Sequence, residues 1–142
     1  MTNPPALSGQ DIGQAARATN ALLETLLTDA GLPFNTWVAL NVLVTTGPQP
    51  RAALVQRLTH GLKIAADVAQ AAVDELVSRH YASENAPGLQ IADAGTALHG
   101  RIRAGIDGIT ERLYGDLPAG DLATTRRILG IVIERANAEL AS

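Results

Sequence analysis

The sequence predicts a mainly α-helical fold with one short β-hairpin near residue 85. Three observations predict it. Apolar residues recur at intervals of three and four along most of the chain, glycine and proline residues interrupt that pattern, and one stretch, YASENAPGLQIADAG, is too punctuated for a helix. The 142 residues correspond to about one domain and suffice to bury a hydrophobic core.

Four helices are expected before the hairpin, over residues 8–30, 33–47, 50–61 and 64–79. Ser8 is a typical N-cap residue for the first, and Pro33 suits the first turn of the second. In the second helix Trp37, Leu40 and Val44 recur at helical spacing, so we expect them in the core.

The hairpin is expected from strands Tyr81–Ser83 and Leu89–Ala92 around the turn Asn85–Gly88. A long helix should follow from Asp93, and a last one should span residues 119–140. The first and last helices carry more apolar surface than a thin central module can cover. Two chains are therefore expected to pack together through their N- and C-terminal helices.

Charge and composition narrow the function. The net charge of −3 and the isoelectric point near 5.5 argue against a strong binder of polyanions. Residues 51–82 nevertheless carry a net charge of +1, which leaves −4 on the rest of the chain. Because cysteine is absent, disulfides, thiolate metal sites and cysteine nucleophiles are excluded.

No targeting or catalytic signature is visible. The N-terminal stretch MTNPPALSGQDIG does not resemble a signal peptide, and no apolar run is long enough for a membrane span, so we expect a soluble, cytoplasmic protein. The three histidines are scattered, and neither a nucleophile elbow nor a glycine-rich phosphate loop is present. We therefore predict no enzyme, no catalytic residue, no metal site and no cofactor.

Three stretches carry a resemblance to a known family. They are GLPFNTWVALNVL at 31–43, RAALVQRLTHGLKIAADVAQAAVDELVSRHY at 51–81 and LQIADAGTALHGRI at 89–102. In order, they resemble the second helix, the helix-turn-helix and the segment between wing and long helix of the MarR (multiple-antibiotic-resistance regulator) family. Together with the order of elements, they make the whole chain similar to these winged helix-turn-helix transcription factors.

The resemblance implies a single domain over residues 1–142. Residues 33–92 would form a winged helix-turn-helix module that binds double-stranded operator DNA, and the helices at 8–30 and 93–142 would form a homodimer. It also implies a transcriptional regulator, in the form of a repressor that responds to a small-molecule effector.

A DNA-reading helix contacts base edges from its N-terminal turns, on the side opposite its core stripe. With Ala69, Val73 and Leu76 facing inward, the outward residues are Ala66, Asp67, Gln70, Ala71 and Asp74. Gln70 can pair with adenine through two hydrogen bonds, or it is simply a solvated polar residue. Asp67 can accept from cytosine N4, or it complements the helix dipole.

Phosphate contacts would fall to Arg51, Arg57, His60 and Lys63, around the first helix of the motif and its turn. The alternative is an ordinary solvated helix face. For the effector, the resemblance implies a cleft between the dimer helices and the DNA module, which points to Phe34, Trp37, His99 and Tyr114. Core packing explains Trp37 equally well.

Two positions and the wing depart from the family pattern. Ala71 stands where an arginine is usual, His80 stands where a glycine closes the reading helix, and the wing SENAPG lacks the usual Asp-x-Arg and has no basic residue. These departures favour an alternative, in which a dimer of this fold has a degenerate DNA face and acts as a ligand-binding or protein-interaction module.

Overall fold

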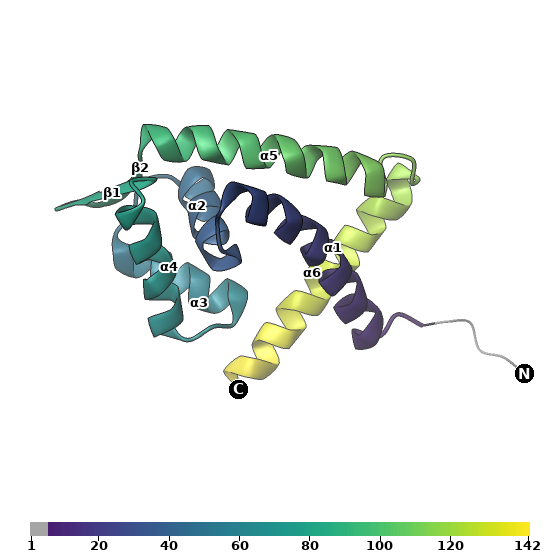
Figure 1. Ribbon diagram of the computed structural model, residues 1–142. Coiled ribbons are helices and arrows are strands. Elements are labelled where there is room, and N and C mark those ends of the chain that lie inside the picture. The colour runs from purple at the N-terminus through teal and green to yellow at the C-terminus, as the bar shows by residue number, and fades with distance from the viewer. Residues whose placement is uncertain (1–5) are drawn as a thin grey trace, which may run out of the picture. The chain divides into compact units, whose positions relative to one another are not determined.

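The computed structural model describes residues 6–142. Within them lie six α-helices and one antiparallel hairpin (Figure 1), in the order α1 (Gly9–Ala30), α2 (Phe34–Thr46), α3 (Arg51–Leu62), α4 (Ala66–Ser78), β1 (Ala82–Asn85), β2 (Gly88–Ile91), α5 (Asp93–Tyr114) and α6 (Ala119–Ala141). The predicted architecture is confirmed. The described residues up to Ile106 form one compact unit, and Asp107–Ser142 form a second.

The core of the first unit lies between α2 and α4, and α3, the hairpin and the first half of α5 complete it. The largest fully buried side chains of these elements are Leu40, Leu43, Leu54, Leu58, Val73, Leu76, Leu89 and Leu98. Trp37 and Leu40 are buried as predicted. The expectation for Val44 is wrong, because the buried side of α2 continues at Leu43 and leaves Val44 36% exposed.

The residues at the helix ends explain where the helices begin and stop. The Ser8 hydroxyl accepts from the Asp11 backbone N–H, while the Asp11 carboxylate accepts from the Ser8 backbone N–H, and this reciprocal cap starts α1. After α3, Lys63 adopts a left-handed backbone with φ 57°. Ala65 remains extended, so α4 begins at Ala66 rather than at Ile64 as predicted.

The hairpin is tighter than predicted. β1 extends to Asn85, which pairs with Gly88, so the turn contains only two residues rather than four. In addition to the pairing of the two strands, Gln49 and Leu89 of β2 exchange backbone hydrogen bonds of 3.1 and 2.8 Å. This bridge attaches the hairpin to the segment that precedes α3, which the sequence pattern did not indicate.

The second unit contains the end of α5 and the whole of α6. No residue of α6 is buried, and Ile133 and Leu140 are 60% and 71% exposed. A groove of about 670 Å³ with a mainly apolar lining lies between the two helices, and Tyr114, Leu122 and Leu129 contribute to it. Among the described residues, no helix combines the length and the hydropathy that a membrane span requires.

Candidate nucleic-acid interface

The α4 helix has a buried and an exposed side, and they divide as the helical spacing predicts. The buried side includes Ala69, Val73 and Leu76, each with 0% exposure. The exposed side includes Ala66, Asp67, Gln70, Ala71 and Asp74. By their spacing, Asp67, Ala71 and Asp74 lie farthest from the core. The outermost stripe of α4 is therefore short and acidic.

The first turn of α4 uses the Asp67 carboxylate locally. Asp67 Oδ1 accepts a hydrogen bond of 3.0 Å from the Val68 backbone N–H. This N–H belongs to the first helical turn, whose donors have no partner within the helix. The contact supports the role of Asp67 in complementing the helix N-terminus, one of the two interpretations open from the sequence.

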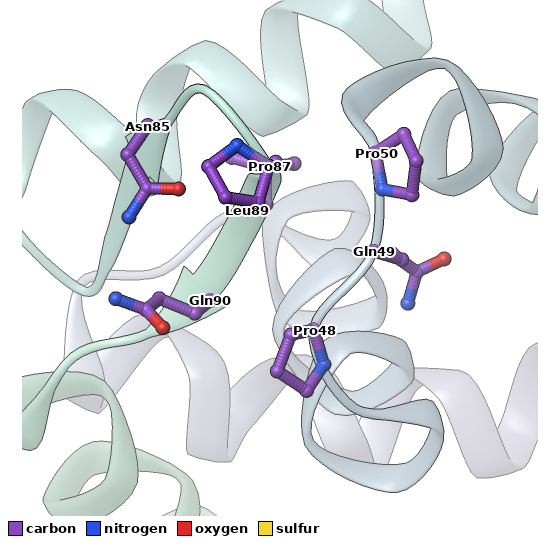
Figure 2. Close-up of a pocket in the computed structure, with 8 residues that line it drawn as sticks. Pro48, Gln49, Pro50, Asn85, Pro87, Leu89 and Gln90 are labelled. Atoms are coloured by element: carbon purple, nitrogen blue, oxygen red, sulfur yellow. The ribbon is translucent and has the colours of Figure 1, made fainter.

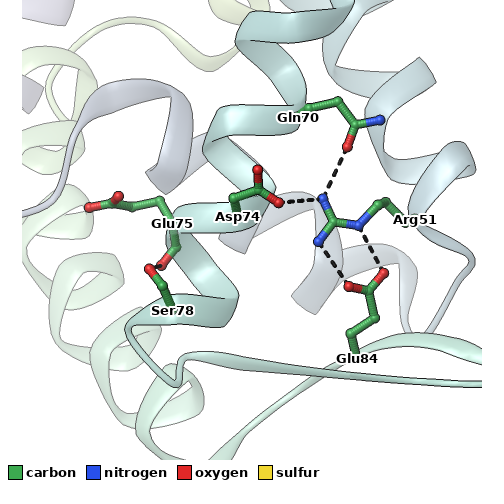
Figure 3. A network of polar contacts seen from close by, with 6 residues as sticks. All are labelled: Arg51, Gln70, Asp74, Glu75, Ser78 and Glu84. Carbon is green, nitrogen blue, oxygen red and sulfur yellow. Dashed lines mark hydrogen bonds and ion pairs between the residues drawn. The ribbon is translucent and has the colours of Figure 1, made fainter.

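Arg51, the first residue of α3, is the centre of a polar network that joins three elements (Figure 3). Its Nε and Nη2 donate to the two carboxylate oxygens of Glu84 on β1, both over 2.8 Å. Its Nη1 donates to Asp74 Oδ1 over 2.7 Å and to Gln70 Oε1 over 3.0 Å. We refer to Arg51, Gln70, Asp74 and Glu84 as the Arg51 network.

The electrostatics of the Arg51 network differ from those expected of a phosphate contact. The hydrogen bond from Arg51 lowers the pKa of Glu84 below its ordinary value, so this carboxylate is charged at neutral pH. The bonds with Glu84 and Asp74 likewise raise the pKa of Arg51. One guanidinium with two carboxylates leaves a local charge of −1. Four of the five donors of Arg51 are occupied, so a phosphate would compete with carboxylates already in place.

The other predicted phosphate contacts lie toward the C-terminal end of α3. Arg57 and His60 are exposed there and line a shallow hollow of about 380 Å³. Lys63 is also exposed, and its Nζ donates to the His60 carbonyl oxygen. The structure thus groups Arg57, His60 and Lys63, and it separates Arg51 from them. That any of them contacts DNA stays a prediction.

No protein-family model and no curated protein sequence matches the chain. Solved structures do. Ligand-free NadR aligns with a TM-score of 0.76 at 17% identity, over 92% of this chain and 99% of that one. Rv2887, a MarR family protein of Mycobacterium tuberculosis in complex with DNA, aligns with a TM-score of 0.70 at 16% identity, over 90% and 98%. CouR from Rhodococcus jostii RHA1, bound to p-coumaroyl-CoA, aligns with a TM-score of 0.72 at 15% identity, over 86% of this chain and 88% of that one.

These likenesses extend over nearly the whole of each chain, and they include a protein that is itself assigned to the MarR family. The chain has the MarR fold. At sequence identities of 15–17% the likeness establishes the fold alone. The fold that the resemblance implied is therefore confirmed. In this MarR fold, α3 and α4 form the helix-turn-helix and the β1–β2 hairpin is the wing.

The predicted effector residues of the MarR fold fall into two groups. Trp37 and His99 stack with ring centroids 5.3 Å apart and an interplanar angle of 21°. Trp37 is only 4% exposed, so it serves the core, and the half-buried Phe34 packs against the same core. Tyr114 belongs to the second unit, where it is exposed. A ligand role for any of the four stays a prediction.

Asn41 is a member of this cluster that sequence reasoning missed. His99 Nε2 lies 2.9 Å from Asn41 Oδ1, so His99 donates this hydrogen bond. Burial lowers the pKa of His99, and the nearby Arg103 lowers it further. Asn41 lies one helical turn after Trp37, a spacing that places both on one side of α2. That spacing was the available signal.

The wing carries a second set of residues that the sequence did not single out. A hollow of about 250 Å³ lies between the wing and the segment before α3 (Figure 2). Its lining includes Pro48, Pro50, Pro87, Asn85 and Gln90 but no charged residue. No group of three or more His, Asp or Glu side chains in the part of the chain that the structure describes could hold a metal ion.

Proposed function

We propose that this protein is a homodimeric, DNA-binding transcriptional regulator of the MarR type, and that it acts as a repressor. The observation that carries the proposal is the exposed outer side of α4. The inner side of this helix is buried in the core, and the wing flanks it. Rv2887, which shares the fold, was solved in complex with DNA. An α-helix presented in this way fits the major groove of B-form DNA.

Dimerisation is part of the proposal because the second unit leaves its apolar surface uncovered. None of the α6 side chains is buried, and those of Ile133 and Leu140 are mostly exposed. Apolar surface of this kind marks an interaction site. A second copy that covers it would also double the phosphate contacts that Arg57, His60 and Lys63 offer to one DNA duplex, with reading helices about one helical turn of DNA apart.

The proposed roles of the site residues follow from their places. Arg57, His60 and Lys63 contact phosphates, whereas Ala66 and Gln70 approach base edges and Asp67 supports the start of α4. Arg51 acts within its network rather than as a phosphate contact. Binding that depends on phosphate contacts weakens steeply as salt rises, because neutralised phosphates release counterions.

The regulator is tested by DNA binding to the region upstream of its own gene, measured at about 50 and about 200 mM salt. We expect preference for a particular upstream fragment over random DNA and a strong loss of affinity at the higher salt. Protein at saturating concentration that binds no upstream fragment better than random DNA would reject the proposal.

Two substitutions separate phosphate contacts from base contacts in the same assay. Arg57→Ala should weaken binding to all sequences alike and reduce the salt slope by about one for each copy. Gln70→Ala should relax sequence preference by about 1–3 kcal/mol at one base pair. If both variants weaken all sequences equally, Gln70 does not read a base.

A small-molecule effector is the further part of the proposal. CouR, which shares the fold, was solved with p-coumaroyl-CoA. An effector that binds near Phe34, Trp37 and His99 in the first unit, or near Tyr114 in the second, would need only to favour a different spacing of the two reading helices to release DNA. Titration of aromatic acids and acyl-CoA thioesters into the protein–DNA complex tests this. Retention of DNA in the presence of every compound would count against these residues as an effector site.

The Arg51 network favours a second candidate function. Its local charge of −1 and the acidic stripe on α4 oppose an approach to phosphates. A dimer of this fold with a degenerate DNA face would act instead as a protein-interaction or ligand-binding module. The DNA-binding assay at two salt concentrations distinguishes the two functions, because such a module would not prefer any DNA fragment at either concentration.

A further inference from the structure

The side-chain amide of Gln70 has an orientation that Arg51 determines. Arg51 Nη1 donates a hydrogen bond of 3.0 Å to Gln70 Oε1. A guanidinium group has only donors, so the amide must turn its acceptor, the oxygen, toward Arg51. The amide nitrogen with its two N–H donors then points away from Arg51, as Figure 3 shows.

Arg51 is itself held from two other directions, so it is a fixed reference for that amide. Both carboxylate oxygens of Glu84 accept from Arg51, and Asp74 accepts from the same Nη1 that contacts Gln70. Charge-assisted bonds of this kind are shorter and stronger than neutral ones. A flipped Gln70 amide would set its own donors against those of Nη1 and lose the bond.

The orientation decides what a base edge must offer to Gln70. Adenine pairs with a glutamine that accepts from N6 and donates to N7, whereas guanine presents two acceptors, N7 and O6. An unconstrained side chain offers both ends of its amide, which is why the sequence alone suggests adenine. The bond with Arg51 occupies one of the two lone pairs of Oε1 and turns the amide so that its two N–H donors face away from Arg51, which complements guanine N7 and O6.

We propose that Gln70 reads guanine through its two amide N–H groups, and that Arg51 is the positioning residue that sets this preference. The inference rests on the proposed DNA-binding function and specifies the base at one position of each half-site. It assigns Arg51 to specificity, although the resemblance suggested phosphate contact.

The orientation is testable without DNA. NMR relaxation of the Gln70 side-chain amide nitrogen reports how ordered that group is on the picosecond-to-nanosecond scale. Arg51→Met keeps the aliphatic stem but removes every donor, and Arg57→Met is a matched control on the same helix. We expect an ordered Gln70 amide in the wild type and the control, and a mobile one in Arg51→Met. Equal mobility in the wild type and Arg51→Met would overturn the orientation.

The base preference is testable by selection from a randomised DNA library. We expect the wild type to select guanine at one position of each half-site. Gln70→Glu leaves Arg51 intact but replaces the outward donors with an oxygen, so it should reduce that preference by about fivefold or more. Arg51→Met should shift the base preference toward adenine. Arg57→Met should weaken binding but leave the base preference unchanged.

The outcomes separate this inference from the proposed function. A wild-type protein that selects adenine at the position affected by Gln70→Glu overturns the inference and leaves the regulator intact. A wild-type protein that selects no sequence overturns both, and an ordered Gln70 amide would then be a structural contact only.

Discussion

Two residues other than glycine, His80 and Lys63, have a positive φ in the described chain, 64° and 57°. Lys63 is the C-cap of α3, and His80 lies just after Arg79, the C-cap of α4. A left-handed backbone brings Cβ close to the following carbonyl oxygen, which glycine avoids. The structure therefore gives the physical reason why the MarR resemblance places a glycine at the position of His80.

Replacement of that histidine should stabilise the protein. His80→Gly removes the left-handed strain, and this gain exceeds the added entropy of glycine in the unfolded chain, so we expect about 0.5–1 kcal/mol more stability. Urea unfolding measures it as a higher midpoint with an unchanged slope. Gly31→Ala, at φ 70°, is the opposite control and should lower the midpoint. An unchanged or lower midpoint for His80→Gly would show that the strain is absent.

His99 makes stability depend on pH. Its folded-state pKa lies below its unfolded-state value of about 6.5 because burial disfavours the charged ring. Unfolded protein therefore binds more protons in this range, and the stability present above about pH 6.5 is lost as pH falls through the folded-state pKa. Glu84, whose pKa is also lowered, loses its contribution only in more acidic solution.

The check is the free energy of unfolding between about pH 5 and 7.5. Wild type should lose stability toward the acidic end, and His99→Gln should lose much of that dependence. His60→Gln, at an exposed position, serves as a control. A wild type with the same pH dependence as His99→Gln would contradict the assignment to His99.

At the scale of elements, the wing depends on contacts with a segment some forty residues earlier. Gln49 and Leu89 share two backbone hydrogen bonds, and Arg51 bonds Glu84 of β1. Gly88 allows the close approach of these segments. It has φ 138°, and a Cβ there would lie 2.4 Å from the Gln49 carbonyl oxygen.

Gly88→Ala should therefore destabilise the first unit by about 2 kcal/mol or more, since both the backbone angle and the contact with Gln49 oppose a side chain. Gly100→Ala is the matched control. Gly100 lies in α5 with nothing within 4 Å of its missing Cβ, so alanine should raise stability there through helix propensity. Urea midpoints compare the two. Equal shifts would mean that the wing rearranges without cost.

The elements themselves were largely predictable, because each depends on residues close in the sequence. Helical spacing predicted the inward side of α4, and Ser8 predicted the start of α1. The hairpin register was not predictable, because it depends on the bridge between Gln49 and Leu89. The glycine and proline residues near the wing therefore predicted its place in the sequence but not its two-residue turn.

At the scale of the whole molecule, the second unit exposes the apolar surface on which the proposed homodimer rests. The groove between the end of α5 and α6 is lined mainly by apolar side chains, including Leu122, Leu129 and Ile133. Without a partner, these side chains would remain in water. The division of the chain into dimerisation helices at 8–30 and 93–142 and a module at 33–92 stays a prediction.

Ile133→Glu should disrupt dimerisation, because it buries a carboxylate in the apolar contact. We expect sedimentation velocity to show a dimer for the wild type and a monomer for the variant, with weaker DNA binding because one copy contacts only a half-site. Thr124→Glu, on the opposite side of α6 by its spacing, should remain dimeric. A monomeric wild type would contradict the homodimer.

The sequence by itself determined the order of the helices, the place of the wing and the two sides of α4, because these follow from local periodicity and punctuation. Tertiary structure alone decided the stacking of Trp37 on His99 and the direction of the Gln70 amide. Both depend on side chains from elements distant in the sequence. Whether the Arg51 guanidinium is available to a phosphate depends on the carboxylates that the fold places beside it.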